Sequence, residues 1–389
     1  MNSIQKTSIL QSKFIALDSS HLAVLIQEKY SEDEQRRESA QAFEELFNQR
    51  GCVLLLSWHH IEELLKHRNE QVVAQRIAFI RSLPLVAWIS AQIDPEVPGS
   101  VVDILAHEVA VAFRSPEFAA EAIRDQVVKA IFRLDTGQRA IVPFINEWER
   151  LKPSFFEREA RHREIISISK ASKANFAANS KAKIKDLLGS CLNSPEDTEK
   201  QFQTLHDRLV REMRARGDKK IPNVEQTAAI FLGDVRGIAA KSILEAENPA
   251  SQILLSQDID LSDIGDRTTV EDVGHLATFR RKLRIINQTL ELPWPDLKTR
   301  VQEDRVPSGV IQTGLRRYSQ DMLEHKGSEL SDECLACLAA YADITYVDKR
   351  TYENVRRARR KWPAFASIIR RVEKAADYRE IAKHLAQLK

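Results

Sequence analysis

The sequence predicts an α/β protein whose parallel β-sheet is interrupted by a large all-helical insertion. Over residues 1–96, short and continuously apolar segments alternate with segments of helical periodicity. Over residues 97–306 helical periodicity dominates and strand candidates are scarce, but a strand-like apolar segment returns at residues 344–348. Continuously apolar strands are typical of parallel sheets, because helices cover both faces of such sheets.

The first strand is expected at residues 13–18, KFIALD, and a helix is expected to follow from Ser20. A second helix is expected from residues 32 to 50, because its apolar residues recur at helical spacing. Gly51 follows at a position where helices commonly end in a residue of positive φ. This alternation is typical of a doubly wound sheet.

Three further segments are predicted to be strands, at residues 52–57, 83–90 and 344–348. Ser57 is expected to cap the helix that begins SWHHIEEL. A buried helix is expected at residues 332–342, directly before the last strand.

Neither flank of the helical segment has enough strands for a covered parallel sheet, so we expect the two flanks to fold together. Two independent domains are the alternative. The expected organisation is a sheet domain in two parts, at residues 1–96 and 307–361, an all-helical insertion at 97–306, and a basic helical tail at 362–389.

The composition is that of an ordinary soluble protein, with 29% charged and 43% hydrophobic residues. No apolar run approaches the roughly 20 residues that span a bilayer, and the start MNSIQKTSIL lacks the apolar core of a signal peptide. Four scattered cysteines indicate no disulfide framework. We therefore expect a cytoplasmic protein with no membrane partner.

The net charge of +2 is unevenly distributed along the chain. Residues 349–389 contain thirteen Lys and Arg against four Asp and Glu, a net charge of +9. Such a segment favours an anionic partner, although charge runs are also common on solvated helix faces.

Three acidic residues are placed where a parallel sheet binds ligands, beyond the carboxyl ends of its strands, and a fourth, Asp332, joins them only if its helix begins at that same end. Asp18 and Asp348 each end a predicted strand, Glu63 lies in the first two turns of a helix, and Asp332 begins another helix. Two like charges 4 Å apart repel by about 4 kcal/mol at an effective dielectric constant near 20. Such a cluster must hold protons or divalent cations, and oxygen ligands suit Mg²⁺ or Mn²⁺.

The order of these motifs, LDSS, then SWHHIEEL, then SDECLACLAAYADITYVDKRT, resembles that of the PIN-domain nucleases. The resemblance covers the two flanks and not the helical insertion. It implies a PIN-like three-layer α/β/α domain and metal-dependent hydrolysis of phosphodiester bonds, usually in RNA. Carried over by position, Asp18, Glu63, Asp332 and Asp348 would be the catalytic residues and the ligands of Mg²⁺ or Mn²⁺.

Further residues are candidates for supporting roles. Ser19 fits the polar residue that often follows the first aspartate of the family, Glu62 could replace Glu63 as the ligand, and Asp343 is an additional acid. The family often has a hydroxyl residue just before its last aspartate, and this chain has Tyr346 and Val347 there. The residues expected to hold phosphate are basic: Lys349, Arg350, Arg356, Arg357, Arg359, Arg360 and Lys361.

The leading hypothesis is an endoribonuclease. Because many PIN-domain nucleases are toxins of toxin–antitoxin pairs, the resemblance also implies a toxin with an antitoxin, or a phage-defence enzyme. A DNase that acts on single strands or flaps is one alternative, and a binding module without activity is another. A regulatory protein and a second copy of the chain are possible partners of the helical insertion.

Overall fold

The computed structural model describes residues 12–145, 147–176, 180–188, 195–245, 249–320 and 324–387. The chain forms two compact units. The first, which we call the sheet unit, combines Met1–Phe156, Thr289–Gln320 and Ser331–Lys389. The second, the helical unit, consists of Glu157–Gln288 and Asp321–Leu330. Segments from both flanks of the helical unit therefore fold together.

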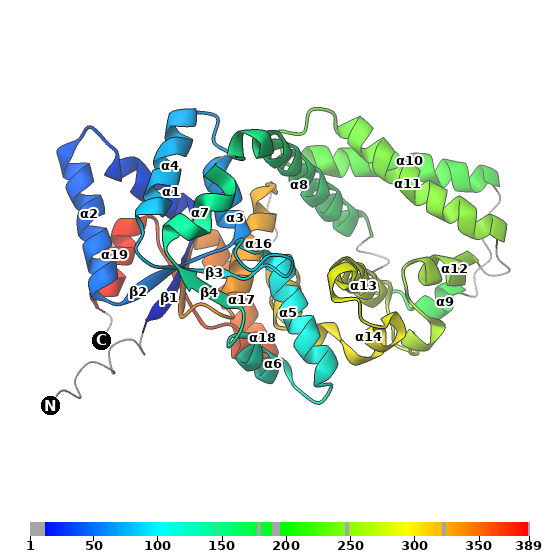
Figure 1. Ribbon diagram of the computed structural model, residues 1–389. Coiled ribbons are helices and arrows are strands. Elements are labelled where there is room, and N and C mark those ends of the chain that lie inside the picture. Colours follow the sequence, from blue (N-terminus) through cyan, green and yellow to red (C-terminus); the bar gives the residue numbers. More distant parts are fainter. Residues whose placement is uncertain are drawn as a thin grey trace. The chain divides into compact units, whose positions relative to one another are not determined.

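A six-stranded sheet with the order β4-β3-β2-β1-β5-β6 forms the centre of the sheet unit (Figure 1). All neighbouring strands are parallel except β4, which is antiparallel to β3. The α/β class with a mostly parallel sheet is confirmed. The strands are β1 (Lys13–Leu17), β2 (Cys52–Leu56), β3 (Val86–Ile89), β4 (Phe132–Asp135), β5 (Ile344–Val347) and β6 (Arg371–Lys374).

Helices of the sheet unit pack on one another in two groups. The first group contains α1 (Ser19–Lys29), α2 (Glu34–Gln49), α3 (Trp58–Leu65), α4 (Glu70–Ser82), α7 (Gly137–Ile145) and α19 (Tyr378–Ala386). The second contains α5 (Val101–Arg114), α6 (Ala120–Val127), α14 (Trp294–Arg300), α15 (Pro307–Tyr318), α17 (Lys349–Lys361) and α18 (Pro363–Ile368), with the 3-10 helix η3 (Glu303–Arg305) beside it.

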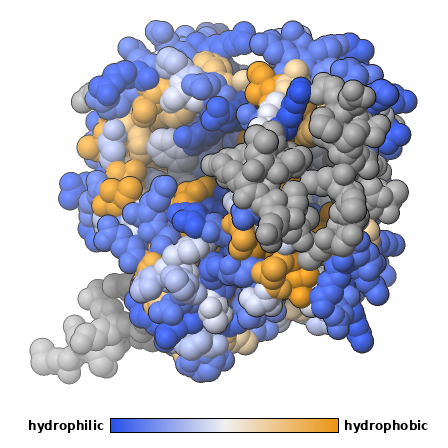
Figure 2. All heavy atoms as spheres, turned by 90° about the vertical axis from the view of Figure 1, so that its right-hand side faces the viewer, coloured by the Kyte–Doolittle hydropathy of each residue, from blue (hydrophilic) through white to orange (hydrophobic). Residues whose placement is uncertain are grey.

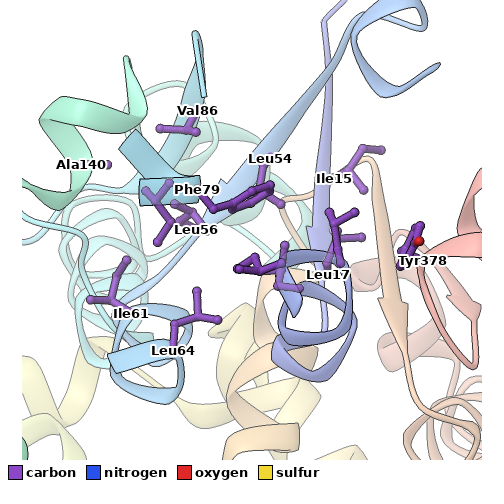
Figure 3. Close-up of a cluster of buried hydrophobic side chains, with 14 of the residues drawn as sticks. Ile15, Leu17, Leu54, Leu56, Ile61, Leu64, Phe79, Val86, Ala140 and Tyr378 are labelled. Carbon is purple, nitrogen blue, oxygen red and sulfur yellow. The ribbon is translucent and has the colours of Figure 1, made fainter. Parts of the chain in front are cut away.

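Alternate strand residues show that each face of the sheet is buried. Ile15 and Leu17 of β1 join Leu54 and Leu56 of β2 in one cluster with residues of the first helix group (Figure 3). The residues between them point to the other face and are also buried, as Ala16 is. Because both faces are covered, the sheet lies between two helical layers.

Two strands were not expected, and both lie at the edges of the sheet. β4 reads FRLD and β6 reads RVEK, so neither has the apolar character from which the inner strands were predicted. Edge strands commonly carry charged residues, which discourage pairing with other chains. The predicted boundaries change accordingly. Residues 97–156 and 289–306, expected in the insertion, belong to the sheet unit, whereas 321–330, expected in the sheet domain, belong to the helical unit. The expected helical tail at 362–389 supplies β6.

The four predicted strands are present, each one to four residues shorter than expected. Gly51 has a positive φ of 63°, as expected of the residue that follows α2. The helix expected at 332–342 is instead α16 (Ser328–Leu338), so Asp332 lies inside a helix and does not begin one.

The helical unit contains α8 (Trp148–Phe176, from its residue 157 onward), α9 (Ile184–Leu188), α10 (Pro195–Arg216), α11 (Val224–Glu245), α12 (Pro249–Ser256), the 3-10 helix η2 (Leu261–Asp263) and most of α13 (Val270–Leu290). Two small apolar clusters lie within it, one around Met213 and one around Ile259. Figure 2 shows a largely hydrophilic face with hydrophobic residues in separate patches. Among the described residues of both units, no helix is both long and hydrophobic enough to span a bilayer.

Glu108 of α5 joins three parts of the sheet unit, and its side chain is completely buried. Its carboxyl group accepts hydrogen bonds from Ser308 N (2.9 Å), from Ser308 Oγ (2.9 Å) and from Tyr341 OH (2.6 Å). Burial disfavours the charged form and raises the pKa of Glu108 to about 7, although these hydrogen bonds lower it.

We predict that Glu108→Gln reduces the pH dependence of stability. Between the ordinary pKa of 4.5 and about 7, the unfolded chain releases a proton that folded Glu108 retains. Rising pH therefore destabilises the wild type through this group, by on the order of 3 kcal/mol over the window. Urea unfolding from pH 4.5 to 8 should show that the variant gains stability relative to the wild type as the pH rises.

Glu117→Gln is the matched control, because Glu117 is exposed. Its stability should follow that of the wild type at every pH. If Glu108→Gln also follows the wild type throughout, the buried carboxyl group does not titrate as described.

Candidate functional site

The pairing of β1 with β5 brings two distant aspartates to one edge of the sheet. Leu17 is in register with Tyr346, and Asp18 N donates a hydrogen bond to Tyr346 O at 3.0 Å. Asp18 directly follows β1, and Asp348 directly follows β5. Next to β1 the sheet continues through β2 and β3, and next to β5 it continues through β6. The two aspartates therefore lie at the point where the strand order reverses, the usual ligand-binding place in such sheets.

Both aspartates also cap helices. Asp18 Oδ1 accepts hydrogen bonds from Ser20 N (2.8 Å) and Ser20 Oγ (2.6 Å) at the start of α1. Asp348 Oδ1 accepts a hydrogen bond from Thr351 N (2.7 Å) at the start of α17. Within the described residues, these hydrogen bonds engage only one oxygen of each carboxylate. The capping role explains how each side chain is held in place and leaves its second oxygen for another ligand.

Asp332 of α16 lies close to these two aspartates. Its carboxylate forms an ion pair with Arg350 of α17. Burial is the main cause that raises the pKa of Asp332 to about 7, and the charges of Asp348 and Asp18 raise it further, while Arg350 lowers it. Three of the four predicted carboxylates thus share one electrostatic environment.

Glu63 is connected to this environment through His60, which lies one turn earlier on α3. The charges of Glu63 and Asp18 both raise the pKa of His60, against the larger lowering that burial causes. The Glu63 side chain is 26% exposed and lies 3.9 Å from Lys66 Nζ. Glu62, the alternative, is only 7% exposed. Glu63 is therefore the more accessible of the two glutamates.

His60 is a residue that the sequence reasoning missed. Its Nδ1 accepts a hydrogen bond from Ser57 N (3.0 Å), so Nε2 carries the proton and donates to Leu17 O (2.8 Å). The ring thereby connects the start of α3 to the last residue of β1. The spacing of Ser57 and His60 is that of a capping box, but the box is usually recognised by Glu or Gln at the second position.

Asp343 does not belong to the site. Its Oδ2 accepts a hydrogen bond from Phe14 N (2.8 Å), and its Oδ1 lies 3.4 Å from Arg370 Nη1. It precedes β5, at the opposite end of the strand from Asp348. The sequence identified Asp343 as an acid next to the last strand, but it did not show that the side chain would lie at the opposite end of the strand from Asp348. Ser19 is half-buried and begins α1, directly after Asp18.

The predicted basic residues divide into structural and exposed groups. Arg359 donates to Ile369 O (3.3 Å), and Arg357 donates to Gln320 Oε1 (3.3 Å), so both are engaged within the sheet unit. Four others are exposed on α17: Lys349, Arg356, Arg360 and Lys361. The first three of these recur at intervals of seven and four, which places them on one helix face.

The donor set is suited to a hard divalent cation, because all four candidate ligands are carboxylates. Asp332 pairs with Arg350, however, and as the side chains lie, no three His, Cys, Asp or Glu among the described residues could hold a metal ion. The chemistry of the donors fits Mg²⁺ or Mn²⁺. A cation held by these carboxylates would require their side chains to rearrange, with Asp332 exchanging its arginine partner for the ion.

Comparison of the chain with protein-family models, with curated proteins and with solved structures gives no match.

We predict that His60→Phe destabilises the protein by about 2–4 kcal/mol, because Leu17 O and Ser57 N lose their buried partner. Urea unfolding at pH 7.5 measures the loss. Glu63→Gln on the same helix is the control, and it should change the free energy of unfolding by less than about 1 kcal/mol. Equal free energies of unfolding for the two variants would show that the His60 hydrogen bonds do not stabilise the protein.

Proposed function

We propose that this protein is a metal-dependent endoribonuclease with a PIN-like catalytic domain. The observation that carries the proposal is the convergence of Asp18, Asp348 and Asp332 at one edge of the sheet, from segments far apart in the chain. Glu63 shares the surroundings of His60 with Asp18 and completes the proposed set.

The charge balance of this edge supports a cation site. Asp332 has one arginine partner, yet its pKa is still raised to about 7, so the local positive charge does not offset the burial and the neighbouring carboxylates. A divalent cation would relieve the repulsion between Asp332 and the carboxylates of Asp348 and Asp18. When bound, such an ion lowers the pKa of a water molecule and stabilises the charge that develops on the phosphate.

The chain's own residues have separable tasks in this proposal. Asp18 and Asp348 are held by their capping hydrogen bonds and would offer their second oxygens to the cation. Asp332 would bind the cation in place of Arg350, and the Arg350 guanidinium would donate to a phosphate oxygen of the substrate. His60 positions both β1 and α3 without contacting substrate.

The exposed face of α17 is the proposed path for the nucleic acid. Lys349 and Arg350 begin the helix beside Asp348, and Arg356, Arg360 and Lys361 extend the positive charge toward its other end. Lysine and arginine side chains bind the phosphate backbone whatever the sequence of bases.

We predict that Asp18→Asn lowers RNA cleavage by about 100-fold or more, because the substitution removes a charged ligand. Cleavage of matched RNA and DNA oligonucleotides with Mn²⁺ measures the activity, and calorimetry with Mn²⁺ alone measures metal binding. We expect cleavage of RNA, its loss in EDTA, and weaker Mn²⁺ binding by the variant.

Asp33→Asn is the matched control, because Asp33 also caps a helix, α2, through Arg36 N (3.3 Å). It should retain activity and Mn²⁺ binding. Equal cleavage by the wild type and Asp18→Asn would remove the catalytic assignment. RNA binding without turnover would favour a binding module, and cleavage of DNA alone would favour a DNase.

We predict that changing Arg356, Arg360 and Lys361 together to Gln weakens the binding of single-stranded RNA and makes it less dependent on salt. Each lost phosphate contact should reduce the slope of log affinity against log salt by about 0.7. Filter binding at several salt concentrations gives the slope. The control changes three exposed basic residues of α10 to Gln, namely Lys200, Arg208 and Arg211. Equal losses in the two variants would contradict a path along α17.

A further inference from the structure

The ion pair between Arg350 and Asp332 lies at the carboxylate edge, on one of the proposed cation ligands. Arg350 is the second residue of α17 and Asp332 lies in α16, so the pair joins two helices. The two side chains are 26% and 21% exposed. A charged ligand from solvent can therefore reach the pair, while partial burial strengthens the attraction between its charges. A cation and the guanidinium would compete for the same carboxylate.

Arg350 occupies a position in α17 that is unfavourable for a positive charge. The first turn of this helix, residues 349–352, contains Lys349 and Arg350 but no acidic residue. The N-terminus of a helix carries a partial positive charge and favours anions nearby. The first turn of α2, by contrast, contains Glu34. The guanidinium is therefore stabilised by neighbouring anions, and Asp332 is the one with which it forms an ion pair.

Binding of a cation by Asp332 would take this anion away from Arg350. The guanidinium would then lie at the start of α17 beside a divalent cation, and both the helix terminus and the cation would repel it. A phosphate group would restore what Arg350 loses, because it is an anion whose oxygens match the planar guanidinium and accept two parallel hydrogen bonds. The cation should therefore bind more favourably when a phosphodiester is present to pair with Arg350.

We propose that Arg350 couples the binding of the cation to the binding of RNA, by pairing with Asp332 when RNA is absent and with a backbone phosphate when RNA is bound. The inference rests on the proposed nuclease site and adds a form of regulation to it. Without RNA the arginine competes with the cation, and with RNA it does not. By linkage, RNA and the cation must raise each other's affinity by the same factor. The site is thus completed in the presence of its substrate.

Calorimetric titration of the full chain with Mn²⁺ measures this coupling, with and without a short phosphorothioate RNA that resists cleavage. The titration is done at pH 8, where Asp332, with its pKa of about 7, is largely ionised. For the wild type, the RNA should raise the Mn²⁺ affinity about tenfold, within the range of about 5- to 150-fold that is typical of coupled sites. Filter binding should show that Mn²⁺ raises the RNA affinity by the same factor.

Arg350→Gln removes the competing charge, and Lys349→Gln is the matched control, because Lys349 is the exposed basic neighbour in the same turn. Without RNA, Arg350→Gln should bind Mn²⁺ about fivefold more tightly than the wild type. The factor by which RNA raises that affinity should fall about threefold or more. Lys349→Gln should keep the wild-type factor, and its Mn²⁺ affinity without RNA should change less than about twofold, because solvent screens an exposed charge.

The coupling is overturned if RNA leaves the Mn²⁺ affinity of the wild type unchanged, or if Arg350→Gln folds and gives the wild-type values. It is also overturned if Arg350→Gln and Lys349→Gln change both values equally. These results leave the nuclease proposal in place when the wild type cleaves unmodified RNA.

A coupling that depends on Arg350, in a protein that cleaves no RNA, would support this inference and overturn the proposed nuclease activity. Both proposals are overturned if neither the wild type nor Arg350→Gln binds Mn²⁺ with or without RNA.

Discussion

The pairing of β1 with β5 is the interaction on which the rest of this structure depends. It joins two segments of the chain that lie on opposite sides of the helical unit, and their contact at Phe14 and Asp343 spans 329 positions. The pairing sets the register at both ends. Asp343 is bound to Phe14 at one end, and Asp18 and Asp348 come together at the other. Without it, the inner strands would form two incomplete sheets and the carboxylates would have no common edge.

Buried carboxyl groups play two different parts in the sheet unit. Glu108 is surrounded by donors from Ser308 and Tyr341, so its environment supplies what the group needs and its role is to join helices. Asp332 has a single arginine and faces two further carboxylates. In both cases burial raises the pKa to about 7, but only the second environment contains excess negative charge. This difference separates a structural carboxyl group from a candidate ligand.

Helix capping and the proposed ligand binding are combined at Asp18 and Asp348. A helix that begins directly after a strand needs an N-cap, and aspartate serves well because its oxygen accepts a backbone N–H. The same local geometry holds the carboxylate at the edge of the sheet. Asp33 also caps a helix, yet it does not follow a strand of the sheet, so capping alone does not make a site. The position of the cap in the tertiary structure makes the difference.

The sequence by itself determined the inner strands, the helices beside them and the acids that follow β1 and β5, because apolar runs and capping residues act over a few neighbouring positions. It did not reveal β4 and β6, whose charged residues read as loops or helices until a neighbouring strand supplies hydrogen bonds. It also placed Asp343 among the candidates and passed over His60. Only the tertiary structure decided these points, since the direction of a side chain across the sheet depends on pairing between residues far apart in the chain.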